Sequence, residues 1–340
     1  MITIDGSHGE GGGQILRTAL ALSAIRGQPF RMVNIRAARK KPGLQPQHLM
    51  AVKSAKTVAN AEVSGDASGS MEITFAPRTI SGGSFRFDIG TAGSISLVLQ
   101  TVIPMLLFAH RDSTITVTGG TNVPFSPSGE YLAQVFAPTL KKLGCTIRIH
   151  GDHYGFYPRG GGKVRVEVFR TEKLSPLEAT VRGAIRHVTG CSGVGNLPDN
   201  IAERQKKRAM ELLKPLPCPV EVERIRVEAY GPGSFVFLRL EEENGLAGFQ
   251  ALGAPGKPAE TVATEAANQL LEHVETGAAM DPHLADQIIL YLALCRERSA
   301  FTTSAVTRHL LTNLWVMELF GACRYAVEGE LGKAGRITIN

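Results

Sequence analysis

Two hydrophobic periodicities follow one another along the first quarter of the chain. Residues 2–5 alternate between apolar and polar, as in a strand with one buried face. After a glycine-rich turn at 9–13, apolar residues of 14–26 recur near every third or fourth position, which predicts a helix. A strand, a helix with proline in its first turn and two short strands complete this unit, at 30–35, 46–60, 62–64 and 71–75.

The same order of elements recurs further along the chain. The second unit has strands and helices at 84–89, 94–109, 113–118, 131–143, 146–150 and 163–169. The third unit lies near the C-terminus, with helices at 282–295 and 306–320 and strands at 324–328 and 336–339. A repeat of about 80 residues is longer than solenoid periods, and it predicts an α+β domain of three pseudo-symmetric β-α-β-α-β-β repeats.

The residues between the second and third units break this pattern. They predict a strongly charged helix, two strands and a further helix, at 200–214, 220–229, 234–241 and 259–274. We interpret residues 183–277 as a small inserted α+β domain. The large domain would then consist of residues 1–182 and 278–340.

The composition is that of a globular protein, with 43% hydrophobic and 20% charged residues. The longest apolar stretch, 95–109, contains Gln100 and Pro104 and is shorter than the ~20 residues that span a bilayer, so we expect a buried helix and no membrane partner. No basic or apolar leader precedes the first strand. Five scattered cysteines without a C-x-x-C pair argue against a disulfide framework or a zinc site, and we expect a cytoplasmic protein.

Positive charge is concentrated near the N-terminus. Residues 11–61 contain no Asp or Glu and nine basic residues, in a chain whose total net charge is +6. Such a field attracts phosphates and polyanions. A solvated basic face is the commoner explanation of a charge run, but the absence of acidic partners favours a phosphate or nucleic-acid site. The nine residues are Arg17, Arg26, Arg31, Arg36, Arg39, Lys40, Lys41, Lys53 and Lys56.

The first glycine-rich turn, 8–13, is a candidate anion site. Glycines let backbone N–H groups and a helix N-terminus approach a phosphate closely, and Arg17 follows one turn into the helix. The lone carboxylate of Glu10 would suit a divalent cation bound to phosphates. A purely structural turn that needs positive φ is an equal alternative. The chain has neither a P-loop nor the glycine spacing of a dinucleotide-binding fold.

The last predicted helix is apolar nearly all round, apart from one polar stripe. His309, Thr312 and Asn313 share a face at i, i+3 and i+4. A single histidine on an apolar helix is usually a core residue, but two polar neighbours favour a cleft. Asp286 and Gln287 begin the preceding helix, and repeat symmetry would gather these groups around one centre.

Several motifs together resemble the RNA 3'-terminal phosphate cyclase family. The resemblance covers essentially the whole chain in order, and its first and last motifs are highly specific. It also implies a large domain of three repeats with a small inserted domain. The motifs are 6–17, 38–44 with Gln47 and His48, 90–94 with 99–101, 155–158 with 160–162, 285–287 and 309–313.

The resemblance implies an enzyme that uses ATP to convert an RNA 3'-phosphate end into a 2',3'-cyclic phosphate. His309 would be the nucleophile that becomes linked to AMP, and Glu10 would hold a divalent metal, Mg or Mn. His283 stands where the family often has a tyrosine that stacks on adenine. The remaining residues implied to contact ATP, its phosphates or the RNA end are Gln14, Arg17, Arg36, Arg39, Gln47, Gln100, Pro127, Leu284, Ala285, Asp286 and Gln287.

Three other functions compete with this one. A non-catalytic cyclase-like protein of ribosome biogenesis would bind RNA but lack the catalytic histidine, whereas this chain has His309. An enolpyruvyl transferase also uses repeated α+β units but forms no histidine–nucleotide bond. A plain RNA-binding module would bind phosphate-ended and hydroxyl-ended RNA alike. The sequence does not fix the oligomeric state, and a homo-oligomer is one alternative.

Overall fold

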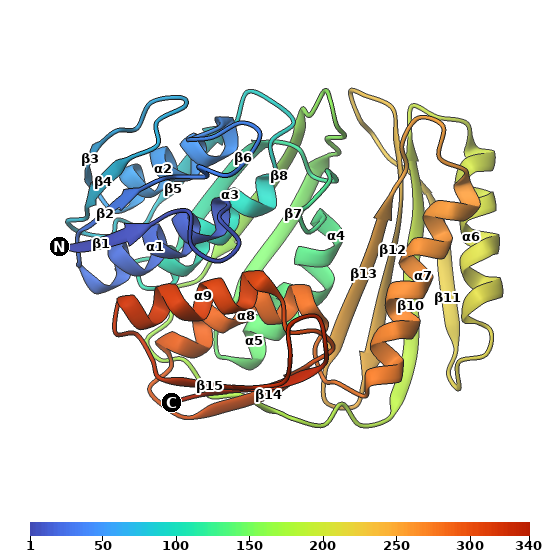
Figure 1. Cartoon of the computed structure of the whole chain (residues 1–340). Helices are drawn as coiled ribbons and strands as arrows, with labels where there is room; N and C mark the ends of the chain where they lie inside the picture. Colours follow the sequence, from blue (N-terminus) through green and yellow to red (C-terminus); the bar gives the residue numbers. More distant parts are fainter.

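The computed structural model describes residues 1–340, which form four four-stranded sheets covered by helices (Figure 1). The first sheet has the order β1-β2-β4-β3. Its second strand ends earlier than the predicted 30–35, because Asn34 and Arg36 adopt φ of 55° and leave the extended conformation. The elements of this part are β1 (Ile2–Asp5), α1 (Gly13–Arg26), β2 (Phe30–Val33), α2 (Pro46–Val58), β3 (Glu62–Ser64) and β4 (Ile73–Ala76).

The second sheet has the order β5-β6-β8-β7. The single helix predicted at 131–143 is wrong, because five residues inside it form a π-helix. Pro138, at the start of the following helix, has no N–H to continue α-helical hydrogen bonding. The elements are β5 (Ser84–Asp88), α3 (Ile95–Leu107), β6 (Ser113–Gly119), α4 (Gly129–Tyr131), η1 (Leu132–Phe136), α5 (Ala137–Lys142), β7 (Ile147–His153) and β8 (Gly162–Val168).

The third sheet has the order β15-β16-β14-β9, and two of its strands were not predicted. β9 is only two residues long, and β14 is buried along nearly its whole length, so neither alternates in hydrophobicity. In each of these three sheets the strand that comes first in the sequence (β1, β5 or β9) pairs in parallel with the next strand of that sheet, and the other two pairs are antiparallel. The elements are β9 (Glu178–Ala179), α8 (Pro282–Leu294), β14 (Ser299–Thr303), α9 (Arg308–Leu319), β15 (Tyr325–Glu328) and β16 (Gly335–Ile339).

The fourth sheet, β11-β10-β12-β13, is built from residues between β9 and α8. α6 and α7 cover one face of this sheet, and the other face looks toward the rest of the molecule (Figure 1). Alternate residues of β12 follow this division: Val236 belongs to a small core of 15 buried residues, and Phe235 belongs to the main core of 68. The elements are β10 (Ile185–Gly195), α6 (Asp199–Leu213), β11 (Val220–Arg226), β12 (Gly233–Glu242), β13 (Leu246–Leu252) and α7 (Ala259–Thr276).

The mixture of sheets and helices confirms the α+β class. α3, the helix expected from the longest apolar stretch, is almost entirely buried. No helix combines the length and the apolar character that crossing a membrane would require. α1 packs against α2, α3 and α9, so the N-terminal helix meets the C-terminal one in the middle of the main core.

Candidate active site

A cavity of about 680 Å³ opens where α1, α3, α8 and α9 approach the inner face of the fourth sheet. Residues from four distant parts of the sequence share its wall. Eight of the site residues predicted from the sequence line this cavity: Gln14, Arg17, Gln100, Pro127, His283, Asp286, Gln287 and His309.

The position of His309 is fixed by the cap of its helix. Thr307 is the N-cap of α9, and its hydroxyl accepts a hydrogen bond from the backbone N–H of Leu310 at 2.9 Å. The same hydroxyl donates to the carboxyl group of Asp286 on α8. His309 therefore lies in the first turn of a helix whose start is tied to the neighbouring helix.

Asn313 joins three helices through its side chain. Its amide nitrogen donates to the carbonyl of Asp286 at 2.9 Å, and its amide oxygen accepts from Thr18 at 2.7 Å and Gln14 at 3.0 Å. Thr312, on the same face of α9, accepts from the backbone N–H of Glu10 at 3.2 Å. Both side chains are buried, so the polar stripe predicted to face a cleft does so only at His309.

The glycine-rich turn brings Glu10 beside His309. Gly9 and Gly11 have φ of 58° and 59°, and a Cβ on Gly9 would lie 2.6 Å from the hydroxyl of Thr312. The turn therefore needs glycine for its own structure. It holds Oε2 of Glu10 at 3.7 Å from Nδ1 of His309, while Oε1 pairs with Arg39.

The pKa of His309 is lowered from its ordinary value. Removal of the ring from water is the main cause, since it disfavours the imidazolium ion. The positive charges of Arg17 and Arg39 and the neighbouring His283 lower the pKa further, and the Glu10 carboxylate opposes them. The neutral imidazole, which has a free electron pair, is therefore the prevailing form at neutral pH.

Burial also raises the pKa of Asp286 to about 8, with the nearby carboxylates of Asp281 and Glu10 adding to the effect. Asp286 therefore holds a proton in a large fraction of molecules at neutral pH. Burial lowers the pKa of Arg17 to about 10, and Arg17 nevertheless stays charged. The two groups place one neutral acid and one permanent cation on the cavity wall.

Three polar atoms of cavity-lining residues have no hydrogen-bond partner in the protein. They are Nε of Arg17, Oε1 of Gln100 and Oε1 of Gln287. Buried polar groups are nearly always paired, so unpaired ones on a cavity wall indicate a polar ligand. A guanidinium donor and two amide groups suit phosphate oxygens together with a hydrogen-bonding base or sugar.

Other predicted site residues do not line the cavity. Leu284 and Ala285 are fully buried in the main core. Arg36 donates to the carbonyls of Lys41 and Gly43 and so shapes the basic loop.

Arg39 and Gln47 also lie outside the lining. Arg39 is bound to Glu10 by an ion pair and by a 2.8 Å hydrogen bond to its carbonyl. Gln47 accepts from the backbone N–H of Ser94, the N-cap of α3, at 3.1 Å.

Sequence reasoning missed several residues of the site. Gln250, Lys257 and Gln269 of the fourth sheet and α7 form its far wall. Nothing in their local sequence indicates this, because only the tertiary fold brings them there. His48 is buried near Gly13, and burial together with Arg17 and Arg36 lowers its pKa to about 3. The only indication of His48 in the sequence was its position directly after Gln47, in the motif of residues 38–44 with Gln47 and His48.

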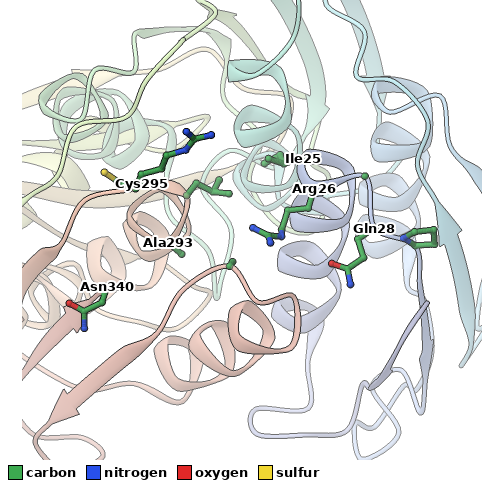
Figure 2. A pocket seen from close by; sticks show the side chains of 11 residues that line it. Ile25, Arg26, Gln28, Ala293, Cys295 and Asn340 are labelled. Carbon is green, nitrogen blue, oxygen red and sulfur yellow. The ribbon is translucent and has the colours of Figure 1, made fainter.

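A second depression, of about 810 Å³, lies at the C-terminal ends of α1 and α8 (Figure 2). Arg26, Cys295 and Asn340 are among its lining residues. Helix C-termini carry partial negative charge, which opposes an anion there. None of the unpaired buried polar atoms belongs to a residue of this depression. It is therefore a poorer candidate than the cavity at His309.

Comparison with known proteins points to one family. The family profile described as RNA 3'-terminal phosphate cyclase matches residues 8–327. Proteins carrying that name are similar along the whole chain: one from Pyrobaculum aerophilum is 44% identical, covering 99% of this chain and 97% of its own, and one from Pyrococcus furiosus is 46% identical, covering 100% and 98%. A third, from Nostoc punctiforme, is 43% identical, with 96% of each chain covered.

Proposed function

Because the chain belongs to the RNA 3'-terminal phosphate cyclase family and is an enzyme of that activity, we propose that it works through a covalent histidine–AMP intermediate on His309. The observation that carries this proposal is the half-exposed His309 on the wall of a polar cavity, with its Nδ1 facing Glu10. The carboxylate favours the tautomer that keeps the proton on Nδ1. Nε2 is then the nitrogen with a free electron pair.

In the first step, Nε2 of His309 attacks the α-phosphorus of ATP. A nitrogen–phosphorus bond forms, the bond to the bridging oxygen breaks, and pyrophosphate leaves. The lowered pKa of His309 supports this role, because only neutral imidazole is a nucleophile. The N-cap bond between Thr307 and Leu310 keeps the ring in place without rearrangement during the reaction.

The cavity wall offers partners for the rest of the nucleotide. The unpaired Nε of Arg17 suits a phosphate, and the unpaired amide oxygens of Gln100 and Gln287 suit donors on the base or ribose. Pro127 and His283 would hold the adenine ring between them. His283 is itself held edge-on against Tyr131, at 6.4 Å between ring centroids, which limits its rotation.

Glu10 would hold a divalent cation, Mg or Mn. Its Oε2 is buried and has no hydrogen-bond partner, so an oxygen ligand is available. No cluster of three or more His, Cys, Asp or Glu side chains forms a complete metal site. A cation held by one carboxylate together with phosphate oxygens and water needs no such cluster. When bound, it would neutralise phosphate charge.

The two later steps involve the RNA. The RNA 3'-phosphate takes the adenylyl group from His309, which returns to its free state. The adjacent 2'-hydroxyl then attacks the activated 3'-phosphorus and loses its proton, and AMP leaves as the cyclic phosphate closes. This closure is intramolecular, so positioning supplies much of its rate. The exposed Lys40 and Lys41, next to Arg39, would attract the RNA phosphates.

We also propose that the first three sheets are pseudo-symmetric repeats and that residues 183–277 are an inserted domain. Identical orders of parallel and antiparallel pairs support the first proposal. The separate small core under α6 and α7 supports the second. In this arrangement the inserted domain closes the cavity opposite His309 through residues such as Gln250 and Lys257.

The test is incubation with α-phosphate-labelled ATP and magnesium or manganese, without RNA. Native protein should take up acid-labile label, and unlabelled RNA with a 3'-phosphate should then chase the label off as AMP. RNA with a 3'-hydroxyl serves as the control and should leave the label in place. A native protein that binds both RNAs and never takes up label would contradict the mechanism and favour a non-catalytic RNA-binding relative.

A further inference from the structure

Three aromatic side chains are exposed on this protein, and the segments that carry them neighbour one another in the fold. Phe125 is 101% exposed, Tyr157 is 69% exposed and Tyr230 is 65% exposed, whereas the other aromatic residues are buried or half-buried. We propose that these three rings form a stacking track for unpaired nucleotides at the 3' end of the RNA. This inference rests on the proposed function, since it concerns the substrate of the same site.

Isolated β-bridges tie the three segments together side by side. Asn122 pairs in parallel with Phe156, and Tyr154 pairs in parallel with Ala229. Paired backbones lie about 4.8 Å apart, so the segment that carries Tyr157 runs between the other two. Tyr230 directly follows Ala229, and Phe125 follows Asn122 by three residues. The segments that carry Phe125, Tyr157 and Tyr230 therefore lie side by side in that order.

One end of this track reaches the catalytic cavity. Phe125 lines the same cavity as His309, on the loop that also carries Pro127. The other end lies on the inserted part of the chain, where the ring of Tyr230 rests on the backbone of Gly161: a Cβ there would be 2.6 Å from Cδ2 of Tyr230. A strand of RNA that follows the rings would thus run from His309 across the boundary of the two parts.

The surroundings of the rings suit a nucleic acid strand. Arg159 is exposed, and its guanidinium donates to the carbonyl of Tyr230 at 3.4 Å, which holds a positive charge beside the ring. His153 stacks on Tyr230 at 6.1 Å between ring centroids, and its Nε2 lies 3.4 Å from the carboxylate of Glu228. Aromatic rings beside cationic side chains are the common means of binding single strands without sequence preference.

Phe125 shows the clearest sign of a ligand-dependent role. Its φ is 63°, a conformation that is unfavourable for a bulky residue, and its ring has no protein neighbours to compensate. Exposure of the ring to water adds a further cost that a stacked base would remove. The conformation has no evident use in the free protein.

The experiment measures the binding of RNAs that carry a 3'-phosphate on a single-stranded tail of one to six nucleotides after a duplex. Affinity of the native protein should rise with tail length and level off at about three or four nucleotides. Tyr157→Ala and Tyr230→Ala should each weaken binding of the long tail about ten-fold and leave the one-nucleotide tail unaffected. Tyr157→Phe should bind like the native protein, because it keeps the ring.

Leu331→Ala, which shortens an exposed apolar side chain elsewhere, is the matched control for loss of surface area. Equal binding of all tails by the two tyrosine variants would overturn the track. The proposed track would also be wrong if the tyrosine variants bound the one-nucleotide tail as much more weakly as they bound the long tail. The rings would then act on the terminal nucleotide alone.

Phe125 requires a second measurement, because the adenine of ATP is another base that its ring could contact. Phe125→Gly removes the ring and also relieves the backbone conformation, so it tests stacking without added strain. We expect the loss of affinity for tailed RNA to exceed any rise in the KM for ATP in self-adenylylation. A raised KM for ATP with native RNA affinity would assign the ring to the nucleotide instead. Self-adenylylation of the native protein is measured in a separate assay. If the proposed function is wrong, the native protein takes up no label; if only the track is wrong, the native protein takes up label and the tyrosine variants bind RNA normally.

Discussion

Two histidine–glutamate pairs of this protein have nearly the same geometry and opposite surroundings. His309 lies 3.7 Å from Glu10, with side-chain exposures of 46% and 16%. His273 of α7 lies 3.6 Å from Glu242 at the end of β12, with exposures of 1% and 0%. The histidine of the first pair lines the cavity and is flanked by cations, whereas the second pair is sealed beneath α7, where His273 packs against Phe249 of the small core.

The sealed pair is poorly hydrogen-bonded. Both carboxylate oxygens of Glu242 and both ring nitrogens of His273 lack a hydrogen-bond partner, and Arg182 approaches Glu242 only to 3.6 Å. In the open pair, by contrast, Arg39 pairs with the Glu10 carboxylate, and the hydroxyl of Thr312 accepts a hydrogen bond from the Glu10 backbone N–H. The same two residue types thus lie where a ligand can reach them in one pair, which is where we propose the chemistry, and are closed off from any ligand in the other.

Removal of His309 should have the largest effect on activity. His309→Ala deletes the proposed nucleophile, and we expect self-adenylylation to fall by at least about 10³-fold, to below detection. Labelling with α-phosphate-labelled ATP measures this. His273→Leu is the matched control, because it removes the other histidine of the comparison. At a temperature where the His273→Leu protein is folded, it should still become labelled. If both variants lost the label although the same fraction of each was folded, the difference that we propose between the two histidines would be wrong.

Removal of one partner of the sealed pair should have the largest effect on stability. His273→Leu leaves the Glu242 carboxylate buried without its partner, and we expect the free energy of unfolding to fall by about 3–5 kcal/mol. Urea denaturation followed by circular dichroism measures this.

Two further variants sharpen that result. Glu242→Leu combined with His273→Leu should recover part of the loss, since no buried carboxylate remains and Arg182, which loses its acidic partner, is still 21% exposed. Glu10→Ala should cost about 1 kcal/mol or less, because its partner Arg39 is largely exposed. If Glu10→Ala lowered the free energy of unfolding more than His273→Leu, the open pair and not the sealed pair would contribute more to stability.

The buried Asp286 predicts a pH dependence of stability. Its pKa is raised to about 8, so between about pH 4 and pH 8 the folded protein keeps a proton that the unfolded chain has released. The free energy of unfolding should therefore fall as pH rises through this range, by of the order of 1 kcal/mol per pH unit from this group. Asp286→Asn should have a flatter profile in urea unfolding at pH 5, 6, 7 and 8. Parallel profiles for the two proteins would contradict the raised pKa.

The smallest expected effect is a shift in the pH dependence of self-adenylylation. The rate should fall on the acid side as His309 becomes protonated, at a pH below its ordinary pKa. Glu10 raises that pKa, so Glu10→Gln should move the acid limb to still lower pH, by less than about one unit. Initial rates from pH 4.5 to 8 at saturating ATP and metal measure the limb. A shift to higher pH would show that Glu10 does not act on His309 electrostatically.

Much of the fold could be predicted from hydrophobic periodicity, and the failures share a cause. Helix α2 and alternating strands such as β6 were identified because one face is buried and the pattern repeats. β10, β13 and β14 were missed because long stretches of them are buried on both faces, so apolar residues do not alternate. The parallel partner of β14 is too short to give any pattern.

The site was predicted less completely than the fold. His309 and Glu10 were singled out by residue type and position, and the structure brings them together. The stripe of Thr312 and Asn313 was interpreted as facing the cavity, but both side chains are turned inward, Thr312 to the glycine-rich turn at Glu10 and Asn313 to Thr18 of α1. The spacing of residues on a helix shows which of them share a face, but it does not show what that face contacts. Gln250 and Lys257 could not be foreseen, because they reach the cavity only through the docking of a distant sheet.

The pairing of β9 with β14 determines when the protein can finish folding during its synthesis. The backbone of Leu177 donates to the hydroxyl of Ser299 across a separation of 122 residues, with the whole fourth sheet translated between them. At ribosomal rates of roughly 5–20 residues per second, the first of these strands waits roughly 6–24 s for its neighbour. The backbone of Glu10 binds Thr312 across 302 residues, so the loop and the histidine meet only when the last helix has been translated. Stalled or truncated chains therefore cannot bring Glu10 and His309 together, and by the proposed mechanism uptake of label would count only chains that are complete through α9.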